Sequence, residues 1–294
     1  MSKILKSSIL VLILIAIAFW AFYYYRDNIL KLYENTSEGL SNLNKTDFQD
    51  ALNEIKKEVF TPSPLNIGGA SNNSVLTKEK IIAQTNFQRY DNGTLTPLIE
   101  NQKLNQVALA KANDMFKNQY FEHVSPSLVG PGDLAKSFEY DYVLVGENLI
   151  LGNFKDEKEV VELWMNSPGH RANILNERFT EIGVAIVRGT YNGKTAWIGV
   201  QEFGLPLSAC EQPNLEVKNQ IEVSQSMLEE LSVKIDLKKE EIENTNKKSN
   251  DYSKKVDEYN KLVGEYNALS QEIKNLILQY NNQVNVFNQC VEGS

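Results

Sequence analysis

Histidine and cysteine, the residues best suited to chemistry at neutral pH, are scarce in this chain of 294 residues. The chain has two histidines, His123 and His170, and two cysteines, Cys210 and Cys290. An imidazole titrates near neutrality, so each histidine could transfer protons or bind a metal ion. Two cysteines are too few for a four-thiolate zinc site or a disulfide-rich scaffold. Any such chemistry therefore depends on where the two histidines lie.

Charge and motif content exclude several classes of function. The formal net charge of −8 leaves no basic surface of the kind that binds nucleic acid phosphates, so we expect no nucleic-acid partner. Neither G-x-S-x-G nor H-E-x-x-H occurs. Residues 189–195 resemble a phosphate-binding loop, but the spacing is one residue short and no helix follows. The Asn192-Gly193 pair instead favours a tight hairpin turn.

The elements around the histidines can be predicted from periodicity and turn signals. Apolar residues at helical spacing predict helices near residues 77–90, 101–119 and 156–166. Two strand-like runs, residues 182–188 and 196–203, flank the Asn192-Gly193 turn and should pair as a hairpin. Both histidines fall in connections between these elements or at their ends.

A series of short motifs occurs in a fixed order through this central region. They are TNFQR (85–89), YFEHVSP (120–126), GENL (146–149), WMNSPGHR (164–171), NIL (173–175), FTEIGV (179–184) and VQEFG (200–204). Together they resemble the bacterial branch of the CAP superfamily, also called the SCP domain, over about residues 76–204. The resemblance implies an α+β fold, an α-β-α sandwich with a small antiparallel sheet.

The resemblance also implies a ligand cleft, which two histidines and two glutamates line in animal members. His123 and His170 match the histidines, and Glu147 matches the first glutamate. The second glutamate aligns with Ser167, so a neutral hydroxyl replaces a charged oxygen there. The implied ligand cleft therefore consists of His123, Glu147, Ser167 and His170, and its capacity to bind a cation is reduced.

Three uses of such a cleft are open. His123, Glu147 and His170 could weakly bind a divalent cation such as zinc. Glu147 or a histidine could serve as the general base of a hydrolase acting on peptides or cell-wall material. The third use is a cleft that requires no cofactor and binds a lipid, a cell-envelope component or a protein partner. Because no recognised nucleophile accompanies the histidines, we favour the non-enzymatic binding module.

The N-terminal region should anchor the chain in a membrane. Every residue of 9–22 is apolar, and three tyrosines extend the run to residue 25, just long enough to cross a bilayer. Lys3 and Lys6 precede it, which favours a cytoplasmic N-terminus and an extracytoplasmic bulk. We therefore predict that residues 4–25 contain a signal-anchor, which crosses a bacterial cell membrane once. A cleaved signal peptide is the alternative, although the apolar run continues past the candidate cleavage site at residues 16–18.

Between the anchor (1–26) and the central domain (76–204) we predict a stalk and a linker. Residues 27–60 form the stalk, with an amphipathic helix over 47–60, where apolar residues recur at helical spacing. Residues 61–75 are rich in Pro, Gly, Asn and Ser, which indicates a flexible linker.

The C-terminal region, residues 205–294, carries a different pattern. Apolar residues recur at alternating steps of four and three, typical of a coiled coil, along arms at 214–243 and 252–288. An antiparallel hairpin of these arms would bring Cys210 and Cys290 together, so we predict a disulfide between them. Two free thiols and an intermolecular bridge are the alternatives. The hairpin could also drive oligomerisation, which would make the protein a structural assembly component.

Overall fold

The computed structural model describes residues 57–70 and 73–293, which belong to two compact units. The first unit contains the described residues up to 211 together with residues 287–293, and the second contains residues 212–286. The predicted membrane anchor and most of the predicted stalk lie outside the described residues. Within the part of the chain that the structure describes, no helix is sufficiently long and apolar to cross a bilayer.

A six-stranded sheet is the centre of the first unit. Its strands are β1 (Glu58–Phe60), β2 (Leu65–Gly68), β3 (Ile99–Glu100), β4 (Tyr142–Gly152), β5 (Glu181–Tyr191) and β6 (Lys194–Pro206). The order is β1-β4-β6-β5-β3, and β2 also pairs with β4. The long strands β4, β6 and β5 pair antiparallel, whereas β1, β2 and β3 pair parallel to their neighbours. The expected antiparallel sheet is therefore mixed, because short segments run along both of its edges.

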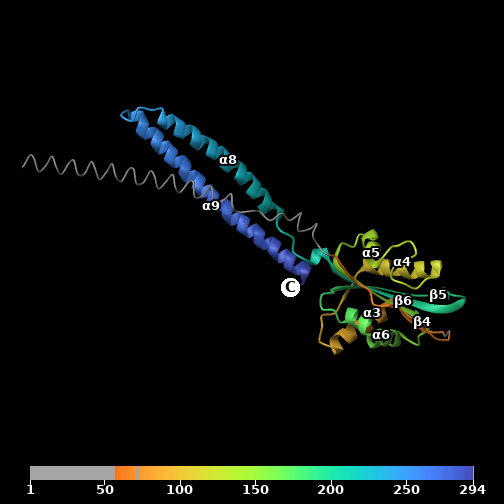
Figure 1. The fold of residues 1–294 in the computed structure, drawn as a ribbon. Coiled ribbons are helices and arrows are strands. Elements are labelled where there is room, and N and C mark those ends of the chain that lie inside the picture. The colour runs from red at the N-terminus through yellow and green to blue at the C-terminus, as the bar shows by residue number, and fades with distance from the viewer. Residues whose placement is uncertain (1–56, 71–72, 294) are drawn as a thin grey trace, which may run out of the picture. The chain divides into compact units, whose positions relative to one another are not determined.

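Helices cover both faces of this sheet. They are α3 (Lys78–Asp91), α4 (Gln102–Asn118), α5 (Pro131–Ser137), α6 (Glu157–Asn166) and α7 (Pro168–Ile174), and a short helix η1 (Leu207–Ala209) follows β6. Figure 1 shows α4 and α5 over one face of the sheet and α3 and α6 over the other. Since both faces are covered, all eleven residues of β4 are buried. The predicted α+β class and the layered arrangement are confirmed.

Two local features fix the position of β5. The β5–β6 hairpin turns at Asn192 and Gly193, whose φ angles are 50° and 74°, as a two-residue hairpin turn requires. Gly183 lies directly beneath α4: a Cβ at this position would be 2.1 Å from the Leu104 carbonyl carbon. The absence of a side chain therefore lets α4 pack on the backbone of β5.

The segment that precedes α3 differs from its prediction. We expected a helix that ends at Phe60 and a flexible linker over residues 61–75. Instead Glu58–Phe60 form β1, Leu65–Gly68 form β2, and both pair with β4. Pairing with a strand some 85 residues further along the chain gives these backbone groups partners, and this outweighs the local Pro and Gly content.

The second unit is an antiparallel helical hairpin of α8 (Leu215–Glu243) and the portion of α9 (Asn250–Glu292) up to residue 286. Near the turn, Lys238 Nζ lies 3.0 Å from the Glu258 carboxylate, and Ile235 of α8 packs against Tyr259, Val263 and Tyr266 of α9. At the other end, the Asn214 backbone N–H donates to Gln283 Oε1 at 3.0 Å. The two helices are those expected, whereas supercoiling and oligomerisation stay predictions.

Cys210 and Cys290 form the predicted disulfide, with their Cα atoms 5.6 Å apart. Both cysteines belong to the first unit. Arg178 supports the same region, because its guanidinium donates to the Val291 carbonyl at 2.8 Å and lies 3.4 Å from the Glu58 carboxylate. The last residues of α9 are thereby fastened to the sheet-containing unit.

Candidate functional site

His123 and Glu147 form the centre of the candidate site. Glu147 lies in the middle of β4 and is fully buried, and His123 lies in the connection between α4 and α5. His123 Nδ1 is 2.6 Å from Glu147 Oε1, and His123 Nε2 is 2.5 Å from the Pro62 carbonyl oxygen. A backbone carbonyl oxygen only accepts hydrogen bonds, so His123 Nε2 is the donor to Pro62, while Nδ1 is engaged by the Glu147 carboxyl group.

A buried lysine holds the loop that carries His123. Lys111 of α4 donates from Nζ to the His123 carbonyl at 2.6 Å and lies 5.1 Å from the centre of the Tyr120 ring. Burial lowers the pKa of Lys111, an effect that the nearby carboxylates of Glu147 and Glu202 partly offset. The backbone of His123 is therefore fixed from the side of α4.

Glu202 is a site residue that the sequence patterns did not reveal. It lies on β6 directly opposite Glu147 in the antiparallel register, and it is buried. Burial, together with the neighbouring Glu147, raises the pKa of Glu202 well above its ordinary value. The signal in the sequence was an acidic residue in an otherwise mostly apolar strand run, but its cross-strand partner could not be read from the chain.

Ser167 and His170 form a second pair. Ser167 is the N-cap residue of α7, and its Oγ lies 2.8 Å from His170 Nδ1. His170 is 1% exposed, and burial together with the nearby His123 lowers its pKa to about 4. Within the described structure, its Nε2 has no hydrogen-bond partner. His170 is therefore a neutral base at physiological pH.

A buried amide network connects β4 with α7. Asn148 Nδ2 donates to the His170 carbonyl and to Gln201 Oε1, both at 3.1 Å. Asn173 Nδ2 donates to Asn148 Oδ1 at 3.0 Å. These bonds fix the backbone of α7 against the sheet. The four predicted cleft residues thus form two hydrogen-bonded pairs, and no hydrogen bond among the described residues joins one pair to the other.

A cavity of about 290 Å³ lies beside His123. Its lining comes from β1 and the residue after it, from the His123 loop, from α5 and from β4: Val59, Thr61, His123, Val124, Gly130, Pro131, Gly132, Asp133 and Tyr142. Residues of the predicted stalk and linker therefore form one wall of the site, which no pattern in the sequence had indicated.

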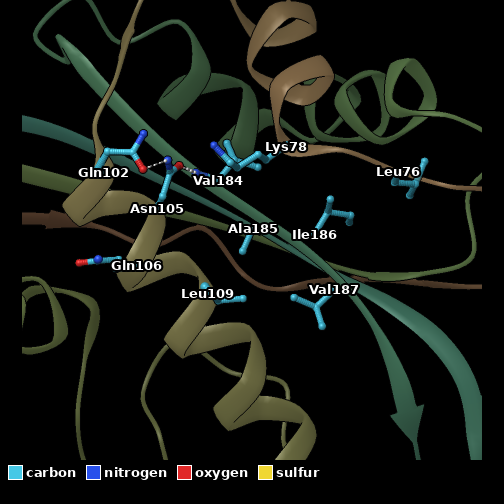
Figure 2. Close-up of a pocket in the computed structure, with 10 residues that line it drawn as sticks. All are labelled: Leu76, Lys78, Gln102, Asn105, Gln106, Leu109, Val184, Ala185, Ile186 and Val187. Carbon is cyan, nitrogen blue, oxygen red and sulfur yellow. Dashed lines mark hydrogen bonds between the residues drawn. The ribbon is translucent and has the colours of Figure 1, made fainter.

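A second cavity, of about 350 Å³, lies between α4 and β5 and is mostly apolar (Figure 2). Asn105 lies at its polar end, where Nδ2 approaches Gln102 Oε1 at 3.4 Å and Oδ1 accepts from the Val184 N–H at 2.9 Å. It contains none of the residues predicted for the site.

The described residues form no assembled metal site. Both nitrogens of His123 are engaged in hydrogen bonds, and Ser167 offers a neutral hydroxyl where the resemblance implies a carboxylate. Among the residues that the structure describes, no group of three or more His, Cys, Asp or Glu side chains could hold a metal. The weak zinc site predicted at His123, Glu147 and His170 stays a prediction: Glu147 Oε2 and His170 Nε2 have no partner in the described structure, but neither ring nitrogen of His123 is free.

Residues 91–203 match the sequence profile of the CAP family, described as the cysteine-rich secretory protein family. Over 136 residues, 46% of this chain, the sequence is 42% identical to the uncharacterized protein YkwD of Bacillus subtilis. The central region of this chain is a bacterial CAP domain. The four residues of the two pairs and Glu202 all lie within the matched range.

Two further proteins are similar to the CAP domain. The uncharacterized membrane protein YlbC of Bacillus subtilis is 35% identical over 115 residues, 39% of this chain. The matches span 52% of YkwD and 33% of YlbC. A Bacillus anthracis extracellular protein containing a SCP domain has a crystal structure that is 34% identical, with a TM-score of 0.37, over 43% of this chain and 39% of that one.

Proposed function

We propose that this protein is a membrane-anchored, extracytoplasmic binding protein of a bacterial cell, whose CAP domain holds a ligand at the cleft of His123 and Glu147. The apolar run at residues 9–22, within the predicted anchor at 4–25, supports the anchor, and the disulfide supports an oxidising compartment. The descriptions of YlbC as a membrane protein and of the Bacillus anthracis protein as extracellular agree with this location.

One observation carries the proposed binding role. The buried His123 already forms two short hydrogen bonds, to the Glu147 carboxylate and to the backbone carbonyl of Pro62. Such a histidine donates a hydrogen bond to an acceptor group, which is recognition chemistry. A general base would instead need a free lone pair directed at a substrate proton. The ligand should therefore present an acceptor oxygen to His123, as lipids, cell-wall polymers and peptides all can.

The hydrolase alternative has one specific observation in its favour, the 2.8 Å contact of Ser167 with His170. A serine nucleophile needs a base that is oriented by a third group and has a pKa near the working pH. His170 has a pKa of about 4, and no carboxylate contacts its Nε2 in the described structure. The pair therefore lacks a base with a pKa near the working pH and a carboxylate that orients it.

The proposal can be tested with the full chain in detergent micelles and isolated Bacillus subtilis peptidoglycan sacculi as the probe. We expect the protein to sediment with sacculi without releasing soluble fragments, and excess phosphatidylglycerol in the micelles to compete if a lipid is the ligand. His123→Ala should reduce sedimentation, whereas Lys158→Ala, on the exposed face of α6, should not. Equal sedimentation of wild type and His123→Ala, or fragment release that Ser167→Ala abolishes, would contradict the proposal.

A further inference from the structure

Residues 58–68, here called the strap, run as one extended segment along the edge of β4. At its start, Glu58, Val59 and Phe60 pair parallel with residues 144–146, and at its end Leu65, Asn66 and Gly68 pair with residues 150–152. Between these two paired stretches the strap passes residues 147–149, where Glu147 lies. The strap is therefore attached to the sheet on both sides of the candidate site.

The sheet pairing is interrupted at the site itself. The middle of the strap is Thr61-Pro62-Ser63-Pro64, and proline has no N–H to donate to a neighbouring strand. Side chains of the CAP domain bind the strap backbone here instead. His123 Nε2 donates to the Pro62 carbonyl at 2.5 Å, and Asn173 Nδ2 donates to the Phe60 carbonyl at 3.3 Å. His123 Nε2, the hydrogen-bond donor of the cleft, is therefore already bonded to a main-chain carbonyl of the same chain.

The domain is also shaped to the side chains of the strap. The nearest heavy atoms to a Cβ built on Gly169 all belong to Pro62, with the closest at 2.6 Å, so only a glycine lets the proline ring approach α7. Phe60 packs edge to face on Phe179, with ring centres 6.3 Å apart. These main-chain and side-chain contacts together form a groove that accommodates an extended peptide.

No residue of the strap is fully buried. Val59, Phe60 and Ile67 are 44%, 39% and 42% exposed. Segments with few buried apolar contacts open at low free energy, so the strap is a segment of the unit suited to local opening. Its departure would remove one wall of the 290 Å³ cavity and free the donor atom of His123.

We propose that the strap is a bound peptide supplied in cis, and that the ligand class of the cleft is an extended peptide that adds a parallel strand to β4. This inference rests on the proposed binding function and specifies its ligand. Such a ligand presents a main-chain carbonyl to His123 and a proline against Gly169. The strap thereby also regulates the cleft, because a tethered segment competes at an effective concentration in the millimolar range.

The first test uses the full chain in detergent micelles with residues 58–68 replaced by glycine and serine at equal length. A fluorescein-labelled peptide of residues 57–70 is added, and binding is measured by fluorescence anisotropy. The replaced chain should bind the peptide, and wild type should bind it at least about tenfold more weakly because its own strap occupies the groove. A scrambled peptide should not bind, and adding His123→Ala to the replaced chain should weaken binding. Equal binding to wild type and the replaced chain, or no binding to either, would overturn the inference.

A second test needs no replacement of the strap. Gly169→Ala introduces a methyl group whose nearest neighbours are atoms of the strap, at a helical position where alanine is favoured. We expect strap amides to exchange with deuterium at least about tenfold faster than in wild type, as measured by mass spectrometry. Gly264→Ala, where a Cβ meets nothing within 4 Å, is the matched control. Unchanged strap exchange in Gly169→Ala would refute a displaceable strap.

The two proposals can fail separately. If His123→Ala reduces sedimentation with sacculi but the labelled peptide does not bind the replaced chain, the binding function stands and the peptide class is wrong. If His123→Ala affects neither measurement, the cleft assignment itself is wrong.

Discussion

The low pKa of His170 makes a quantitative prediction about acid stability. Burial and the nearby His123 keep His170 neutral in the folded protein down to about pH 4, whereas in the unfolded chain it protonates near its ordinary pKa of 6.5. Between these two values only the unfolded chain gains the proton. The contribution of His170 to stability is therefore complete above pH 6.5 and is lost as the pH falls to about 4. At about 1.4 kcal/mol for each pH unit, the total loss is about 3 kcal/mol.

The assay is urea unfolding of the full chain at several pH values from about 4 to about 7.5, followed by tryptophan fluorescence. Trp164 and Trp197 are both buried in the CAP domain and report on its unfolding. Carboxylates also titrate toward the acidic end of this range, so the decisive quantity is the difference between wild type and His170→Asn. Whatever the stability of the variant at neutral pH, it should lose about 3 kcal/mol less than wild type on acidification. Parallel pH profiles of the two proteins would refute the reasoning.

Four further predictions concern stability. Gly183→Ala should cost about 3 kcal/mol or more, measured by urea unfolding, because its Cβ would overlap the backbone of α4; an undisturbed midpoint would contradict that packing. Cys290→Ser should lower stability by about 2–4 kcal/mol relative to oxidised wild type. In a thermal melt, reductant should lower the melting temperature of wild type only. Equal melting temperatures of the two proteins without reductant would count against a stabilising disulfide. Glu202→Gln should match wild type in its free energy of unfolding at about pH 4 and exceed it at about pH 8. Because the pKa of Glu202 is raised, wild type loses stability as rising pH ionises this buried carboxyl group, and the variant does not. Identical pH profiles of the two proteins would argue against this. Ser270→Ala should raise the melting temperature of the helical hairpin, followed by circular dichroism, because the buried Ser270 hydroxyl has no partner in the described structure; a lower melting temperature would indicate one.

Patterns that depend on nearby residues could be predicted from the sequence. The Asn192-Gly193 turn follows from backbone conformations that few residue pairs adopt, and the two long C-terminal helices follow from apolar periodicity. The Cys210–Cys290 disulfide followed from the predicted hairpin, because antiparallel arms of similar length bring their ends together. The assignment of His123, Glu147, Ser167 and His170 to one cleft came from the family resemblance and stays a prediction, because His123 alone of the four lines the 290 Å³ cavity.

What could not be predicted depends on partners distant in the chain. The strap has the composition of a loop, and it becomes two strands only because the edge of β4 offers backbone partners. Glu202 faces Glu147 because of a register that the hairpin and both strands set together. The division of the cleft into two pairs depends on the placement of α7 and on the carbonyl of Pro62, which no local pattern encodes.

The parallel direction of the strap has a mechanical consequence. Because β1 precedes the cleft segment and β2 follows it, tension entering the chain at residue 57 would load the three pairs of β1 first. Once these pairs separate, Pro62 can leave His123 while β2 is still paired. Tension from the N-terminal side would thus act on the pairs of β1 and on the His123–Pro62 hydrogen bond before it reached β2, so the candidate site lies in the part of the CAP domain that is loaded first.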